Sequence, residues 1–201
     1  MISRMGRGEQ ARTAILDAAE RLIAERGPQV PLRDIALAAG QRNNSAVNYY
    51  FRNRQDLIDA IVRRRLEPME RERTQMFAAL DADAVADVHE LLRVLVLPFT
   101  TVDSDYYARF LQAALRQLPT DSASGSVWRD VLDRLAHAIP TIDRLARHRR
   151  VAAIGTAMFA LLAERERASH SAGTGVGDAH EIVTMLAAML TAPLPLSAAV
   201  P

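Results

Sequence analysis

Cysteine is absent from this chain of 201 residues, and lysine is absent as well, so all 25 basic residues are arginine. Without a thiol, the chain cannot use cysteine in catalysis, bind zinc through cysteine or form a disulfide framework. It also lacks any run of about 18 apolar residues, and no apolar segment follows Arg4 and Arg7 near its start. We therefore expect a cytoplasmic protein with neither a membrane span nor a secretory signal peptide.

Apolar residues recur at helical spacing along most of the chain, and no alternating pattern typical of a hairpin occurs. This pattern predicts an all-α fold of about nine helices. The first ends at Gly27, and the others cover about 31–39, 45–50, 53–80, 84–101, 104–118, 126–139, 141–168 and 178–192. Pro68 is expected to kink or interrupt the fourth helix. We expect a helix-turn-helix domain over residues 1–65 and a larger helical domain over residues 66–201.

The charge is unevenly distributed. Residues 1–65 contain 12 arginines against 7 acidic residues, whereas residues 66–201 contain 13 against 17. This asymmetry favours a DNA-facing N-terminal module on a near-neutral or acidic body. The alternative is chance clustering of charges on solvated helix faces.

Residues 32–51 predict a helix-turn-helix, with two short helices joined by a turn that contains Gly40. Small residues are needed where the helices cross, and Ala36, Ala38 and Ala39 provide them. The second helix needs hydrogen-bond donors that reach base edges, because arginine pairs with guanine and asparagine with adenine. The candidate donors are Arg42, Asn43, Asn44, Ser45 and Asn48.

In these residues the sequence resembles the TetR family of bacterial regulators. The matching segments, which lie within residues 11–62, are Ile15-Leu-Asp-Ala-Ala, Glu25-Arg-Gly27, Arg33-Asp-Ile-Ala36, Ala39-Gly40 and Tyr49-Tyr-Phe51, followed by Arg54 and Leu57. Two features depart from the family pattern. The turn near 41–44 has one additional residue, and Asn48 stands where a phosphate-contacting tyrosine is common.

The resemblance implies that the chain is a homodimeric transcription regulator, most simply a repressor, bound to double-stranded operator DNA. It places Ser45, Ala46 and Asn48 on the groove-facing side, with Asn44 near the start of that helix. It also implies that Tyr49 or Tyr50, together with Arg54, contacts phosphates, whereas Phe51 is expected in the core. The basic N-terminal segment with Arg4, Arg7 and Arg12 either extends this surface or is disordered.

The resemblance further implies a cavity in the larger domain that binds a small, largely apolar effector. The candidate ligand-binding residues are His89, Phe99, Tyr106, Tyr107, Phe110, Trp128 and Met158; their alternative role is ordinary core packing. The helices over 141–168 and 178–192 are expected to form the dimer interface, since small residues such as Ala153 and Gly155 permit close helix approach. The alternative is that helix 141–168 is the core helix of a monomer.

Two functions other than transcription regulation are the alternatives for this sequence. An enzyme is disfavoured because His89-Glu90 and His180-Glu181 lack the second histidine of a zinc-binding HExxH motif, and no catalytic serine motif occurs. No catalytic residue, metal site or cofactor is therefore expected. The other alternative is a DNA-organising dimer that binds no effector. The sequence leaves open whether the regulator represses or activates.

Overall fold

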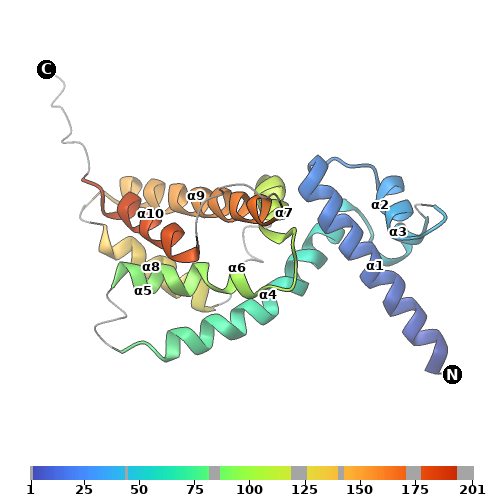
Figure 1. Cartoon of the computed structure of the whole chain (residues 1–201), viewed down its shortest axis with the longest axis horizontal. Helices are drawn as coiled ribbons and strands as arrows, with labels where there is room; N and C mark the ends of the chain where they lie inside the picture. Colours follow the sequence, from blue (N-terminus) through green and yellow to red (C-terminus); the bar gives the residue numbers. More distant parts are fainter. Residues whose placement is uncertain are drawn as a thin grey trace, which may run out of the picture. The chain divides into compact units, whose positions relative to one another are not determined.

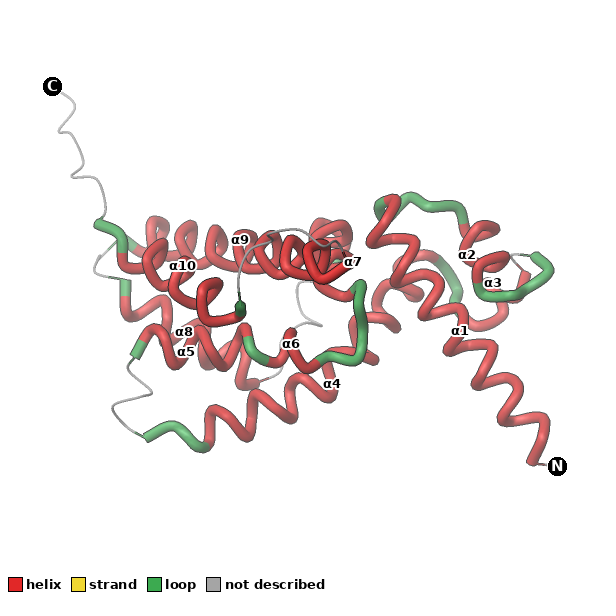
Figure 2. Tube along the Cα trace, viewed as in Figure 1, coloured by secondary structure: helices red, strands yellow, loops and turns green. Residues whose placement is uncertain are grey.

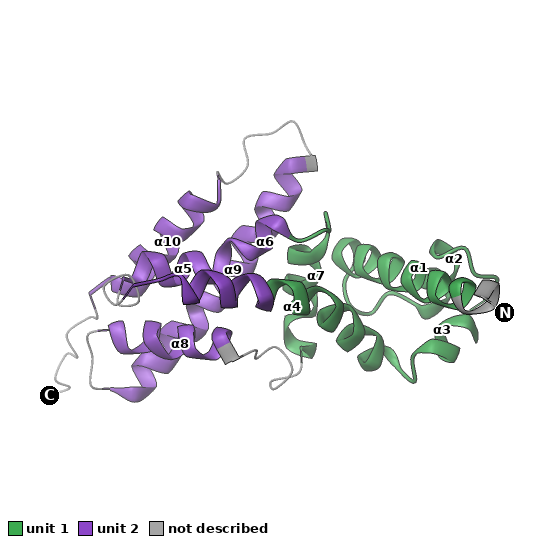
Figure 3. Ribbon diagram, turned by 90° about the horizontal axis from the view of Figure 1, so that it is seen from below, with its two compact units in different colours: residues 1–69, 102–123 green, residues 70–101, 124–201 purple. Residues whose placement is uncertain are grey.

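The computed structural model describes residues 2–43, 45–81, 87–118, 126–139, 143–170 and 178–193. Over these residues it contains helices and no strand (Figures 1 and 2), which confirms the expected all-α fold class. None of the described helices is long and apolar enough to cross a membrane. The chain divides into two compact units: unit 1 comprises Met1–Met69 and Val102–Ala123, and unit 2 comprises Glu70–Thr101 and Ser124–Pro201 (Figure 3).

Unit 1 is a helical bundle in which α1 packs against α2 and α7, and α2 packs against α3. Its elements are α1 (Ile2–Arg26), α2 (Leu32–Ala38), α3 (Ser45–Tyr50), the first part of α4 (Arg54–Ala78), α7 (Tyr107–Ala114) and the 3-10 helix η2 (Leu115–Gln117). Its core contains side chains from each of the first four helices, including Ile15, Ile23, Ile35, Val47, Leu57 and Ile61. The predicted helix-turn-helix is therefore present as α2 and α3.

Two glycines end the first two helices of unit 1. Gly27 and Gly40 have φ values of 88° and 70°, in the left-handed region that residues with a β-carbon rarely adopt. The Gly27 N–H donates to the carbonyl of Ile23 (2.9 Å), which satisfies one of the last acceptors of α1. Both helix ends agree with the sequence prediction.

The segment 102–118 lies in unit 1, although the sequence-based division assigned everything after residue 65 to the second domain. The reason is apolar burial. Helix α7 buries Tyr107, Phe110 and Leu111, and it packs against α1. The helix also begins later than expected, at Tyr107 rather than near 104. Because the apolar face of α7 is covered by α1, this segment is a structural part of the helix-turn-helix unit.

Unit 2 consists of the remainder of α4 and five further described helices: α5 (Val88–Val96), α6 (Pro98–Thr101), α8 (Ser126–Ala138), α9 (Arg144–His170) and α10 (Ala179–Thr191). Helix α10 packs against α5 and α9, and α5 packs against α8. The single helix expected over 84–101 is divided between α5 and α6, because Pro98 has no N–H to donate to the preceding turn. In contrast, α4 continues through Pro68 without interruption.

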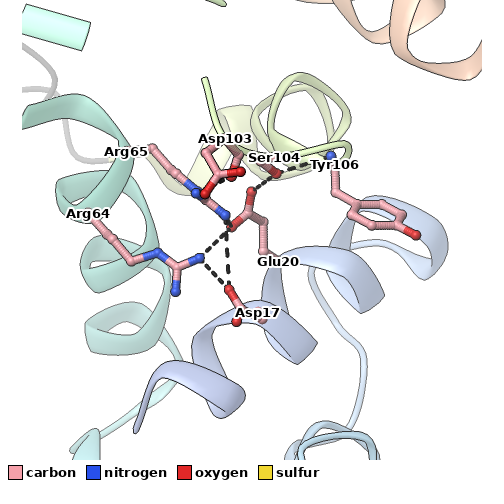
Figure 4. Close-up of polar contacts among 7 residues, drawn as sticks. All are labelled: Asp17, Glu20, Arg64, Arg65, Asp103, Ser104 and Tyr106. Atoms are coloured by element: carbon pink, nitrogen blue, oxygen red, sulfur yellow. Dashed lines mark hydrogen bonds and ion pairs between the residues drawn. The ribbon is translucent and has the colours of Figure 1, made fainter. Parts of the chain in front are cut away.

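A buried polar cluster connects three segments of unit 1 (Figure 4). Glu20 of α1 is only 1% exposed, and its carboxylate accepts hydrogen bonds from Arg65 Nε (3.1 Å) and Nη2 (3.0 Å) on α4. The Ser104 hydroxyl also bonds to Glu20, and Arg65 donates to the carbonyl of Asp103. Arg64 pairs with Asp17 beside them. The cluster therefore joins α1, α4 and the segment before α7.

Candidate nucleic-acid interface

Helix α3 has an exposed polar face and one buried apolar side chain. Val47 is buried, whereas Ser45 and Asn48 are exposed and Ala46 is half-buried. The helix is short, and it is held by burial of this one anchoring side chain and by its contact with α2. The structure thus brings three predicted groove-facing residues onto one small helix with their side chains available to a partner.

The turn before α3 carries two further predicted contact residues, Arg42 and Asn43, and both are exposed. The side-chain oxygen of Asn43 accepts the Ser45 N–H (3.0 Å), so this amide supports the start of α3. The turn is also fastened to α2, because the Gln41 N–H donates to the carbonyl of Ala36 (2.8 Å). Asn44 lies outside the described residues.

Three consecutive aromatic residues at the end of α3 differ in burial. Phe51 is buried, as expected, and Tyr50 is half-buried, whereas Tyr49 is 82% exposed. The rings of Tyr49 and Tyr50 meet edge to face, with centroids 5.0 Å apart. An exposed phenol next to a packed one suits Tyr49 to an external contact, because its hydroxyl keeps its donor while its ring rests on a neighbour.

Arg54, the predicted phosphate contact at the start of α4, also has a structural role. Its Nη1 donates to the carbonyl of Pro28 (2.9 Å), and the side chain is half-buried. This bond ties the start of α4 to the α1–α2 turn. Nothing in the sequence indicates this bond, because a bond between residues 26 positions apart leaves no local pattern.

We expect Arg54→Ala to lower the free energy of unfolding by about 1.5 kcal/mol, since it removes a hydrogen bond from a charged donor. Denaturant unfolding followed by circular dichroism measures this change. Arg63→Ala is the matched control, because Arg63 is exposed on the same helix; it should alter stability by less than about 0.5 kcal/mol. Equal losses in the two variants would contradict the assigned role of the Pro28 bond.

The start of α4 carries a compact ionic cap. Asn53 accepts the Asp56 N–H (2.9 Å), and the Asp56 carboxylate accepts from the Arg52 backbone N–H (3.1 Å) and guanidinium (3.2 and 3.3 Å). The hydrogen bond from the Arg52 side chain is the main cause that lowers the pKa of Asp56; the Arg52 N–H and the nearby positive charge act in the same direction. The same pairing raises the pKa of Arg52.

Arg52→Ala should therefore raise the pKa of Asp56 toward the ordinary aspartate value, which a carboxyl-carbon NMR titration measures. Because the folded pKa of Asp56 is the lower one, its contribution to stability is present above the unfolded-state pKa and is lost as pH falls through the folded value. The free energy of unfolding of Arg52→Ala should therefore fall less on acidification than that of the parent protein. The variant has already lost the pairing that protonation of Asp56 breaks. An unchanged Asp56 titration in Arg52→Ala would exclude Arg52 as the cause.

The predicted ligand-binding residues are distributed between the two units. Phe99, Met158 and half-buried Trp128 belong to unit 2, whereas Tyr106, Tyr107 and Phe110 belong to unit 1. The rings of Tyr107 and Phe110 are stacked with centroids 6.1 Å apart. His89 is exposed at the start of α5, where its Nδ1 lies 3.7 Å from Asp87. Of these residues, Tyr106 lines a cleft of about 510 Å³ in unit 1, beside Glu20, Arg65 and Ser104.

Sequence reasoning missed two buried charges, Glu20 and Arg73. Arg73 of α4 is 1% exposed, donates to Glu70 (2.8 Å) and lies over the rings of Phe99 (5.4 Å) and Trp128 (4.8 Å). For both residues, the spacing in the sequence indicated burial. Glu20 stands four residues after Leu16, and Arg73 four residues after Met69, so each occupies an apolar stripe. Among the residues that the structure describes, no group of side chains is arranged to hold a metal ion.

Comparisons with known proteins agree with this geometry. Residues 15–61 match the model of the family described as "Bacterial regulatory proteins, tetR family". No curated protein matches the chain. Solved structures share the fold at low identity. The fatty acid degradation regulator FadR from Bacillus halodurans is 21% identical, with a TM-score of 0.55; the match covers 90% of this chain and 98% of that one.

Two further solved structures resemble this chain. SmeT, the repressor of the Stenotrophomonas maltophilia multidrug efflux pump SmeDEF, is 23% identical with a TM-score of 0.51, and the match covers 89% of this chain and 87% of that chain. The transcriptional regulator FadR from Bacillus subtilis, solved in complex with stearoyl-CoA, is 15% identical with a TM-score of 0.57, and the match covers 90% and 97% respectively. The similarity therefore extends over both units.

Proposed function

We propose that this chain, a TetR-family regulator by its DNA-binding domain at residues 15–61, is a homodimeric repressor released from palindromic operator DNA by a small, largely apolar ligand. The observation that carries the proposal is the exposed polar face of α3, held by buried Val47 within a helix-turn-helix. Ser45 and Asn48 read base edges, with Ala46 facing the groove and Asn44 as a further base contact. Such a protein acts where the chromosome lies, in the cytoplasm.

The residues around α3 hold it on the DNA backbone. Arg42 and Asn43 lead into the groove, and Tyr49, Tyr50 and Arg54 contact phosphates. Exposure supports this division of roles for Arg42, Asn43 and Tyr49. Arg54 retains its bond to Pro28 while the guanidinium contacts a phosphate near the start of α4, where the helix dipole adds to the attraction. Arg54→Ala should therefore weaken binding to all sequences alike.

Dimerisation through α9 and α10 is supported by what these helices expose. Leu145 and Met189 are large apolar side chains that are 63% and 42% exposed, and small residues Ala152 and Ala153 are exposed on α9. A cleft of about 320 Å³ beside them is lined by Ala153, Ile154 and Met189 together with Arg149 and Arg150. A dimer is also what operator DNA requires, because two recognition helices must enter successive major grooves about 34–36 Å apart.

An apolar effector is supported by the buried and half-buried aromatic and methionine side chains that the two units contain. Phe99, Trp128 and Met158 pack in unit 2, and Tyr106, Tyr107 and Phe110 in unit 1; His89 would contact a ligand only from its exposed position. The related Bacillus subtilis regulator carries stearoyl-CoA, and SmeT has been solved with triclosan. These two molecules are therefore the first probes for thermal stabilisation, which reaches about 2.7 kcal/mol at a hundred times the Kd.

The decisive experiment selects genomic fragments bound by the full chain and then measures a gel shift on the enriched sites. We expect a near-palindromic site bound at moderate salt by a dimer, and release of the DNA by an effector. If no sequence is enriched, the regulator function is wrong. If a site is bound but no metabolite or probe releases it or raises the Tm, the chain binds DNA without sensing an effector.

A further inference from the structure

The first turns of α1 contribute no fully buried side chain among those that the structure describes. In Figure 1 these dark-blue turns continue beyond the bundle toward the N-terminus. Among the side chains described in α1, the first buried one is Ile15, although the helix begins at Ile2. The segment also contains Gly6 and Gly8, each of which costs a helix about 1 kcal/mol relative to alanine. Over residues 6–14, where the side chains are described, none is buried, so this part of the helix leaves a face available to a partner.

Contacts with the aromatic cluster fix where this segment runs. A β-carbon at Gly8 would lie 3.6 Å from the Tyr50 hydroxyl, and the Arg12 guanidinium lies 5.5 Å from the centroid of the Phe51 ring. Tyr50 in turn meets the ring of exposed Tyr49. The segment is therefore adjacent to the end of α3, and its surface is continuous with the one proposed to contact DNA.

The charge of the segment matches a polyanion. Arg7 is exposed and Arg12 half-buried, with Glu9 as the one acidic residue before Asp17. The stacking of Arg12 on Phe51 restrains its planar side chain while leaving the guanidinium edge available for hydrogen bonds. A phosphate accepts such bonds in pairs, and its negative charge complements the two arginines.

We infer that residues 6–12 of α1 form a second DNA-contact surface, in which Arg7 and Arg12 bind backbone phosphates that flank the base pairs read by α3. This inference rests on the proposed DNA binding. The second surface increases the affinity and the length of DNA that is contacted, and it leaves the sequence preference unchanged, because phosphate contacts carry no base information. Because the segment is adjacent to the end of α3 within unit 1, its phosphate contacts fall beside the base pairs that α3 reads.

The test compares Arg7→Ala, Arg7→Ala/Arg12→Ala and the parent protein on the selected operator in two lengths, one trimmed to the site and one with about ten further base pairs, one helical turn, on each side. The parent should bind the long duplex about tenfold more tightly than the short one, and the double variant should bind both alike. Each lost phosphate contact should lower the slope of log K against log salt by about 0.9.

Two control variants separate the outcomes. Arg129→Ala, an exposed arginine on α8, should leave affinity and slope unchanged. Arg12→Lys keeps the charge but loses the paired bonds and the stacking on Phe51, so it should retain the parent salt slope while recovering only part of the affinity. If the double variant binds the long duplex with the parent affinity and slope, the second surface is refuted and the regulator function stands. If the parent binds neither duplex, the proposed function itself fails, and this inference fails with it.

Discussion

Replacing Glu20 with alanine should lower the free energy of unfolding by about 3 kcal/mol, a large fraction of the stability of a small domain. The loss comes from the groups left behind rather than from the pair itself. Arg65 is 13% exposed, and two of its nitrogens bond to the Glu20 carboxylate. Without that carboxylate, a cation stays inside unit 1 with fewer partners, and the Ser104 hydroxyl loses its acceptor.

The size of this effect is limited by what Arg65 retains. It still donates to the carbonyl of Asp103, and Asp17 lies 4.0 Å away, so the loss falls at the lower end of the range for broken buried ion pairs. Glu20→Gln keeps the side-chain volume and one acceptor oxygen, so it should cost less than half as much. Because the cluster holds segment 102–106 against α1, hydrogen exchange in that segment should accelerate in Glu20→Ala before the rest of unit 1.

Denaturant unfolding measures the predicted change, and Glu25→Ala provides the matched control. Glu25 is exposed near the end of the same helix, so its removal should change stability by no more than about 0.5 kcal/mol. A Glu20→Ala variant within 1 kcal/mol of the parent would show that water or Asp17 replaces the carboxylate. The cluster would then contribute little to the packing of α7 on α1.

The helix-turn-helix could be predicted from sequence because its determinants are local. Gly27 and Gly40 mark helix ends through their positive φ, and Val47 and Phe51 fall on the apolar side of a short helix. The cap formed by Asn53 is also a short-range pattern, with its acceptor three residues before the N–H it binds. Each of these features is decided within a few residues, where spacing and side-chain chemistry are visible.

The division into units and the positions of the candidate ligand-binding residues depend on contacts between distant segments, which the sequence does not reveal. The packing of α7 against α1 joins residues that are far apart in sequence, and nothing near Tyr107 indicates that its burial lies in unit 1 rather than unit 2. Aromatic composition alone could not sort the candidate ligand residues, because core and cavity positions use the same side chains. The candidate ligand-binding residues are therefore divided between the two units, and His89 lies on the surface.

Asn48→Asp should reduce operator affinity by about a hundredfold while leaving the domain folded. Asn48 is exposed on α3, and aspartate has nearly the same shape, so neither packing nor the hydrogen bonds of the helix need change. The substitution removes the amide donors that pair with adenine, and it places a negative charge against DNA phosphates. Like-charge contact costs several kcal/mol, and about 3 kcal/mol corresponds to this hundredfold loss.

Salt distinguishes the two parts of this loss. Repulsion between the new carboxylate and phosphates is screened as ionic strength rises, so the defect of Asn48→Asp should shrink between low and moderate salt. Asn48→Ala removes the donors without adding charge, so its defect should stay constant and appear as altered sequence preference. Gln75→Glu is the matched control, because it makes the same change of charge at an exposed position of α4 in unit 2. If Gln75→Glu weakens binding as much as Asn48→Asp, net charge rather than the face of α3 governs DNA binding, and the assignment of α3 as the recognition helix is wrong.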